Sequence, residues 1–379
     1  MPWEEVTVIQ KREEFVMLAS QVNANISQLC GRFDISRKTG YKWLKRAQET
    51  SAEGLHDRSR RPHSCPFKSS DVIEQMVLKI RHAHPAWGGR KIAYVLQRDH
   101  RQEVAPSTVT SILHRHQLIS PAASIAATPW QRFERAAPNE LWQMDFKGHF
   151  AMVTGRCHPL TVIDDHSRYS LVLRACDNEQ RTTVEAQLRW AFERYGLPRQ
   201  INVDNGSPWG TAGQEKLTGL GVWLIRLGIQ LSHSRPFHPQ TNGKDERFHR
   251  SLKAEVLAQR QFKDLQHVQT EFDCWRMIYN CERPHEALSM QTPAQRYSPS
   301  QRPFNAVLPD IDYAQDDIVR KVQQQGWIHF KGHQIRTSRA LIGQPVALRQ
   351  RMDKDAVYDI YFCHQYIDSI DLTTLKNAF

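Results

Sequence analysis

The chain lacks any apolar run that could cross a bilayer, which takes roughly 18 uninterrupted apolar residues. The nearest candidate, at 217–231, is interrupted by Arg226 and by glycines. The first residues include Glu4 and Glu5 and do not have the basic-then-apolar order of a signal peptide. These absences argue against a membrane partner and predict a cytoplasmic protein.

Cysteine is sparse as well, with 7 residues scattered along 379 and no CxxC pair. This spacing excludes a zinc ribbon and a disulfide scaffold, and reduced thiols in a cytosol fit it best. At roughly 150 residues per domain, the chain has room for two to four domains. We therefore expect these domains to be held together by packing rather than by metal or disulfides.

Positive charge is in excess and is unevenly distributed. Lys and Arg total 51 against 40 for Asp and Glu, which gives a net charge of +11. Residues 1–139 contain 21 of the basic residues and 13 of the acidic ones. A basic front segment on a nearly balanced chain indicates a polyanionic partner, so we expect DNA or RNA binding by the N-terminal third.

Residues 1–52 have the pattern of a helix-turn-helix domain. Apolar spacing predicts helices over 8–19 and 26–33, and Ser36 is placed to cap a third helix that runs to about residue 48. We expect this third helix to bury Tyr41 and Leu44. Its basic side chains would then face a DNA major groove, namely Arg37, Lys38 and Lys42. A packing module with a solvated basic face is the alternative.

A linker rich in proline and arginine follows at 53–68. Its arginines are predicted to lie along phosphates or in a minor groove, and they are Arg58, Arg60 and Arg61. An exposed basic tether explains these arginines equally well.

Residues 69–120 repeat the helix-turn-helix pattern. A helix is expected near 71–82, and PSTVTSILHR at 106–115 is typical of a second recognition helix with Ser107 as its N-cap. Ser107 and Thr108 are therefore predicted DNA contacts. A purely structural helix bundle is the alternative for residues 69–120. A linker rich in Ala, Ser and Pro is expected to follow over 121–138.

The segment 139–300 changes to alternating apolar and polar residues. The pattern predicts an α/β domain in which three antiparallel strands precede alternating helices and strands. The expected strands are 141–146, 160–163, 169–174, 199–203 and 229–232.

Three carboxylates occupy informative places in this layout: Asp145 within the first strand, Asp204 after the fourth, and Glu246 in the first turn of a later helix. Carboxylate oxygens without soft ligands suit Mg²⁺ or Mn²⁺. Two such ions roughly 4 Å apart can drive an in-line phosphodiester displacement. A single Asp is more often a turn cap or a surface charge, so the combination carries the argument. Asp164, Asp165 and His166 could replace members of the set, although their hairpin position favours a turn.

The helix that begins near Glu246 also carries basic residues. Lys253 lies seven residues on and returns to nearly the same face. Together with Lys244, Arg247 and Arg250, it is predicted to hold a DNA phosphate near the acids. Pairing of Glu246 with Arg250 on an exposed helix is the alternative.

Three blocks in this segment resemble a known family: LWQMDF at 141–146, VDNG at 203–206 and HPQTNGKDERFHRSLK at 238–253. They are similar to blocks of the bacterial insertion-sequence transposases of the DDE class, which have a retroviral-integrase-like core. GLHDRSRRP at 54–62 and YNCERPH at 279–285 are also similar to these enzymes. The resemblance implies an RNase H-like catalytic core with Asp145, Asp204 and Glu246 as metal ligands and Lys253 as a DNA contact.

Two features differ from related enzymes. The second and third acids are further apart than is usual in this class, and an insertion around 209–221 would account for it. The zinc-binding His/Cys module at the front of retroviral integrase is absent, which favours the bacterial type.

The tail at 310–379 alternates again and predicts a small β-barrel-like domain for DNA binding or assembly.

The combined prediction is an RNase H-like α/β core, preceded by tandem all-α helix-turn-helix domains and followed by a β-rich domain. We expect a transposase that binds double-stranded DNA at the ends of an insertion sequence. With Mg²⁺ or Mn²⁺, two ions per site, it would cut a strand and join the 3′-hydroxyl to target DNA. Holding two ends requires a homodimer or higher oligomer, associated with the nucleoid. A non-catalytic regulator, a decayed transposase and a nuclease without joining activity are the alternatives.

Overall fold

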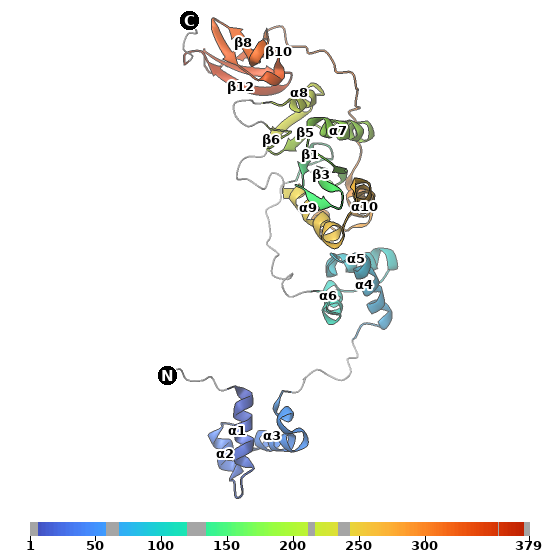
Figure 1. The fold of residues 1–379 in the computed structure, drawn as a ribbon, viewed down its shortest axis with the longest axis vertical. Coiled ribbons are helices and arrows are strands. Elements are labelled where there is room, and N and C mark those ends of the chain that lie inside the picture. Colours follow the sequence, from blue (N-terminus) through green and yellow to red (C-terminus); the bar gives the residue numbers. More distant parts are fainter. Residues whose placement is uncertain are drawn as a thin grey trace. The chain divides into compact units, whose positions relative to one another are not determined.

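The computed structural model describes residues 7–57, 68–119, 134–210, 217–233, 243–354 and 356–374 (Figure 1). Internal contacts divide the chain into two compact units, Met1–Lys68 and Ser69–Phe379. The linker arginines Arg58, Arg60 and Arg61 lie outside the described residues, so their DNA contacts stay a prediction. The predicted domain boundaries likewise remain predictions.

The first unit is a three-helix module, as expected. Its helices are α1 (Val8–Ala19), α2 (Ile26–Arg32) and α3 (Arg37–Thr50), followed by a 3-10 turn, η1 (Ser51–Leu55). Ser36 caps α3, because its hydroxyl accepts a hydrogen bond from the backbone N–H of Thr39 at 3.2 Å. The basic residues predicted to meet DNA are all exposed: Arg37, Lys38 and Lys42.

The predicted burial of Tyr41 is wrong. Tyr41 is 58% exposed, whereas Trp43 is 6% exposed and takes the core position. Gly40 explains the difference, because α3 approaches Phe15 and Cys30 so closely there that no side chain fits between them. Trp43 lies three residues further on the same face, and the Arg12 guanidinium covers its ring at 4.0 Å.

The second helical group comprises α4 (Asp71–Ala83), α5 (Gly89–His100) and α6 (Pro106–Arg115). Contrary to expectation, Ser107 is not the N-cap of α6. The helix begins at Pro106, the residue before Ser107, and Ala105 takes the N-cap position. Proline suits this first position because its missing N–H has no partner there anyway. Ser107 is exposed and Thr108 is half-buried.

The core domain is built on a six-stranded mixed sheet, as predicted. In it, β3 (Gly155–Asp164) pairs antiparallel with β1 (Leu141–Phe146), β2 (Phe150–Met152) and β4 (Ser170–Cys176). On its other side β1 pairs parallel with β5 (Gln200–Val203), which pairs parallel with β6 (Gln230–His233). This is the RNase H-like arrangement, and only the short β2 was not expected.

Helices cover both faces of this sheet. On one face, α7 (Arg181–Tyr195) and α8 (Gly219–Arg226) pack on alternate strand residues that include Trp142, Met144 and Val203. On the other, α9 (Gly243–Glu255) and α10 (Leu265–Met277) pack on the intervening residues, such as Ile163 and Leu173. The alternation of β1 therefore sends Trp142 and Met144 into the first core and leaves the polar Gln143 and Asp145 on the side of α9.

Short helical segments complete this domain. They are η4 (Leu257–Gln259), a π-helical turn η5 (Ile278–Glu282), η6 (Glu286–Leu288) and α11 (Pro293–Arg296). None of the helices in the described ranges is both long and apolar enough to cross a membrane.

The tail forms two small antiparallel sheets. β7 (Ile318–Lys321), β10 (Pro345–Gln350), β11 (Val357–Phe362) and β12 (Gln365–Asp371) make a sheet of order β12-β11-β10-β7. β8 (Trp327–Phe330) and β9 (His333–Arg336) form a hairpin, with 3-10 turns η7 (Gln324–Gly326) and η8 (Arg339–Leu341). The tail shares a hydrophobic cluster with Val222 and Ile225 of α8. The β-rich C-terminal region is thus confirmed.

The close packing at Gly40 gives a test with a matched control. A Cβ at Gly40 would lie 2.6 Å from the Cys30 sulfur and 2.9 Å from Phe15, whereas one at Gly31 would meet nothing within 4 Å. We predict that Gly40→Ala lowers the opening free energy of α1–α3 by about 1 kcal/mol, because overpacking exceeds the gain in helix propensity. Gly31→Ala should raise it by up to about 1 kcal/mol. Hydrogen exchange of residues 7–57 in the full chain measures both. Equal protection in the two variants would contradict the packing described here.

Candidate active site

Asp145 and Asp204 are brought together by the register of two parallel strands. Leu141 pairs with Gln200 and Gln143 with Asn202. The same offset places Asp145 level with Asp204, at the carboxyl ends of β1 and β5. Neighbouring strands lie about 4.8 Å apart, and level residues point to the same face. The backbone ladder therefore sets two of the three predicted carboxylates side by side, and both are half-buried.

The pKa of Asp145 reflects both its burial and the nearby charge of Asp204. Burial is the main cause that raises the pKa of Asp145 to about 7, and the negative charge of Asp204 raises it further. The charges of Glu179 and Glu246 act in the same direction. Burial also raises the pKa of Asp204, although a hydrogen bond from the backbone N–H of Gly206 at 3.0 Å opposes the shift. Asp145 is thus a largely desolvated carboxyl that also lies under the negative charge of neighbouring carboxylates.

The position of Glu246 depends on its neighbour Asp245, which is anchored in the sheet. The Asp245 side chain is fully buried, and both of its oxygens lie 3.1 Å from the hydroxyl of Thr161 on β3. The backbone N–H of Asp245 donates to the side-chain oxygen of Gln143 on β1 at 3.3 Å. The first turn of α9 is therefore fixed on β1 and β3, with exposed Glu246 as its next residue. The preceding loop, at 234–242, lies outside the described residues.

A second group of possible ligands is present beside the predicted one. Ligand atoms of Asp145, Asp245 and His249 all lie within 4.8 Å of one another. Burial first, and then the charge of Lys147, lower the pKa of His249 to about 3, so its imidazole is neutral. Burial and the charge of Asp145 raise the pKa of Asp245 well above its usual value.

The two groups of residues differ in how well they suit Mg²⁺ or Mn²⁺. Mg²⁺ prefers oxygen ligands and keeps several of its waters, which a fully enclosed carboxyl next to an imidazole does not permit. Asp145 and Asp204 are half-buried and Glu246 is exposed, so these oxygens offer both the hard donors and the access that Mg²⁺ or Mn²⁺ needs. A divalent cation would also offset the repulsion that raises the pKa of Asp145. By donor type and access the predicted set suits such a metal better than the buried set does, but of the two sets, within the described residues, only the buried one has its ligand atoms within 4.8 Å of one another.

Asp245, His249 and Thr161 are not among the site residues predicted from the sequence. A signal was present, since Asp245 and His249 stand four apart in the same stripe of α9 as the buried Phe248 and Leu252. That stripe faces the sheet and carries polar groups among apolar ones. Thr161 gave no signal, because only the register of β3 brings it opposite Asp145.

The predicted DNA-contacting residues of α9 divide into two groups. Arg247, Arg250 and Lys253 are exposed, and in the part of the chain described here Glu246 makes no ion pair with Arg250. Lys244 instead forms an ion pair with buried Asp165, and burial is the main cause that lowers the pKa of Lys244 to about 8. A DNA phosphate would have to compete with that carboxylate.

The hairpin acids Asp164 and Asp165 do not replace the predicted set. Asp164 accepts hydrogen bonds from the backbone N–H of Asn139 at 2.7 Å and from the N–H and hydroxyl of Ser167 at 2.8 and 2.6 Å. Asp165 accepts from the amide of Gln143 at 2.9 Å. The contacts of Asp164 with Ser167 are those of a turn, as expected from the sequence, whereas Asn139 and Gln143 are distant in sequence.

Comparison with known proteins assigns families to most of the chain. An integrase core domain matches residues 135–239, and a second integrase core model matches 227–293. The C-terminal domain of IS481 family transposases matches 317–378. These segments are similar to insertion-sequence transposases with an integrase-like core. A helix-turn-helix domain also matches residues 11–63 of this chain, and a homeodomain-like domain matches 39–113.

Similar proteins come from insertion elements and viruses. An IS407 protein of Burkholderia multivorans is 27% identical over 42% of this chain and 55% of its own length. An IS476 protein of Xanthomonas euvesicatoria is 28% identical over 42% of this chain and 44% of its own length. This chain thus spans about half the length of these relatives. A chain of the simian T-cell lymphotropic virus intasome is 18% identical and covers 80% of this chain and 98% of its own, with a TM-score of 0.38.

The repulsion at Asp145 predicts a stability effect with a defined pH dependence. A carboxyl whose pKa rises from about 4 when unfolded to about 7 when folded stabilises the fold only while protonated. Stability is therefore lost as the pH rises from about 4 through 7. We expect Asp145→Asn to stabilise the metal-free protein by about 1–3 kcal/mol near pH 8 and to have little effect near pH 4.

Thermal unfolding in a chelator measures this difference. Added Mg²⁺ should raise the melting temperature of the wild type near pH 8 and leave that of Asp145→Asn unchanged. A variant that is less stable than wild type at both pH values would show that Asp145 is not under the repulsion described.

Proposed function

We propose that this chain is a DNA transposase that cuts a strand at the end of its element and joins the 3′-hydroxyl to target DNA. The observation that carries the proposal is the pairing of β1 with β5, which sets Asp145 beside Asp204. Glu246 completes the set from the anchored first turn of α9. Both steps are attacks of an oxygen nucleophile on a phosphodiester, so one carboxylate set can serve both.

Asp145, Asp204 and Glu246 would hold Mg²⁺ or Mn²⁺, with two ions per site. When bound, such ions supply Lewis-acid activation of the attacking hydroxyl and stabilise the leaving oxygen. The protein's own contribution is placement. The strand ladder fixes two carboxylates, and the buried Asp245 fixes the helix that carries the third.

The surrounding basic residues would bring DNA to this site. Lys253, Arg250 and Arg247 are exposed on α9, beside Glu246. Arg37, Lys38 and Lys42 on α3, with Ser107 and Thr108 on α6, would bind the element ends. We expect a homodimer or higher oligomer on DNA, because transposition requires two ends to be held together, and we place it at the nucleoid in the cytoplasm.

Carboxylate variants test the catalytic part of the proposal. Asp145→Asn, Asp204→Asn and Glu246→Gln should each reduce Mg²⁺-dependent joining by more than about 100-fold, beyond the 10–100-fold usual for outer-shell changes at metal sites. Duplexes that carry the inverted repeats flanking the gene are the substrate, and joined products are read on a denaturing gel. Asp310→Asn, at an exposed carboxylate of the tail, is the matched control and should join DNA normally.

Three outcomes distinguish the rival functions. Gel-shift binding should persist in all variants, because the helix-turn-helix domains are unchanged. Binding without any metal-dependent nicking by the wild type would indicate a regulator or a decayed transposase. Nicking without joining, even with pre-cleaved ends, would indicate a nuclease.

A further inference from the structure

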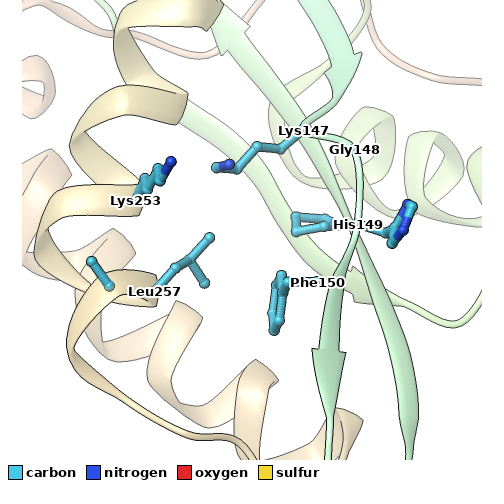
Figure 2. A pocket seen from close by; sticks show the side chains of 8 residues that line it. Lys147, Gly148, His149, Phe150, Lys253 and Leu257 are labelled. Atoms are coloured by element: carbon cyan, nitrogen blue, oxygen red, sulfur yellow. The ribbon is translucent and has the colours of Figure 1, made fainter.

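A cavity of about 290 Å³ lies between the turn after β1 and the end of α9. Its walls are formed by Lys147, Phe150, Pro159, Lys253, Leu257 and Ala258 (Figure 2). Lys147 stands two residues after Asp145, and Lys253 stands two turns of helix after Glu246. The cavity therefore adjoins the candidate active site, although the carboxylates do not line it.

One side of this cavity is cationic. Figure 2 shows the ammonium groups of Lys147 and Lys253 directed toward each other from the sheet and from α9. Neither ammonium group meets a carboxylate or another acceptor in the described ranges of the chain. Two like charges that share a cavity without a counter-ion favour an anion between them.

The other side of the cavity is apolar. Phe150, Pro159 and Leu257 present ring and methyl groups to it, while His149 is directed away (Figure 2). Phe150 is held from behind by Phe262, with ring centres 5.5 Å apart. An aromatic side chain beside cationic groups is a combination that binds single-stranded nucleic acid, by base stacking and by phosphate contacts.

We propose that this cavity holds one unpaired nucleotide of the DNA, with its phosphate between Lys147 and Lys253 and its base against Phe150. The inference rests on the proposed function in that DNA must lie beside the carboxylates. A base within a duplex cannot enter, because it is paired and stacked on both sides, and extruding it costs a few kcal/mol. The site would therefore favour DNA that is already open.

Binding of forked and blunt DNA tests this proposal with the full chain and without divalent metal. The forked probe is a duplex with a few unpaired nucleotides at one end, one of them 2-aminopurine, and the blunt probe is the same duplex fully paired. Wild-type protein should bind the forked probe about tenfold more tightly, as one stacked base allows. It should also quench the 2-aminopurine fluorescence.

Phe150→Leu keeps an apolar side chain of similar size but removes the stacking, so it should abolish both the preference and the quenching. Lys147→Gln should weaken forked binding several-fold and lower the slope of its salt dependence by about one phosphate contact. Lys263→Gln, at an exposed lysine outside the cavity, is the matched control and should behave as wild type.

Equal affinity for the two probes in the wild type would overturn the proposal, as would a preference that survives in Phe150→Leu. If Lys147→Gln weakens forked and blunt binding equally, the lysine contacts the duplex backbone only and no nucleotide is captured. These measurements require no catalysis. If the preference for forked DNA is absent, metal-dependent joining can still support the proposed transposase function. If joining is absent, the preference for forked DNA can still support the nucleotide site.

Discussion

The buried contact of Asp245 with Thr161 determines where α9 begins on the sheet, and the geometry of the site depends on it. Asp145 and Asp204 need only the strand ladder, which the backbone provides by itself. The third carboxylate has no such support, because it follows a loop and lies on a helix. Asp245 supplies the missing constraint, because its fully buried carboxyl contacts Thr161 on β3 and its backbone N–H donates to Gln143 on β1. Glu246 takes its position from this neighbour.

The same arrangement stores unfavourable electrostatic energy. Burial first, and then the negative charge of Asp204, raise the pKa of Asp145 to about 7. Such a cluster lowers stability in the absence of a cation, and a fold tolerates it where charge must later be neutralised. Lysine and arginine side chains on the exposed face of α9 place positive charge beside the cluster. The site thus combines a demand for cations with a surface for phosphates.

Much of this could be predicted from sequence, where local patterns decide the structure. Alternation identified the main strands of the sheet, and the order of those strands was enough to bring Asp145 and Asp204 to one edge. The helix-turn-helix patterns gave the helices, since apolar spacing and the Ser36 cap are local signals. The short β2 was not predicted, because three residues are too few to show the alternation of apolar and polar residues that marks a strand.

What could not be predicted depends on contacts between distant segments. The burial of Trp43 rather than Tyr41 follows from the close approach of α3 to Phe15 and Cys30 at Gly40. No local pattern in the sequence indicates this approach. The role of Asp245 depends on a partner 84 residues away in sequence. The cavity beside Lys147 exists only because the turn after β1 meets the end of α9. The catalytic roles of the three acids and the domain boundaries remain predictions.

The most direct test of the account is anomalous diffraction from crystals of the protein with DNA and Mn²⁺. Anomalous peaks about 2.0–2.3 Å from carboxylate oxygens of Asp145, Asp204 and Glu246, with Asp245 still enclosed against Thr161, are the predicted result. A peak bound by Asp145, Asp245 and His249, with Glu246 turned to solvent, would contradict it and make the buried cluster the metal site.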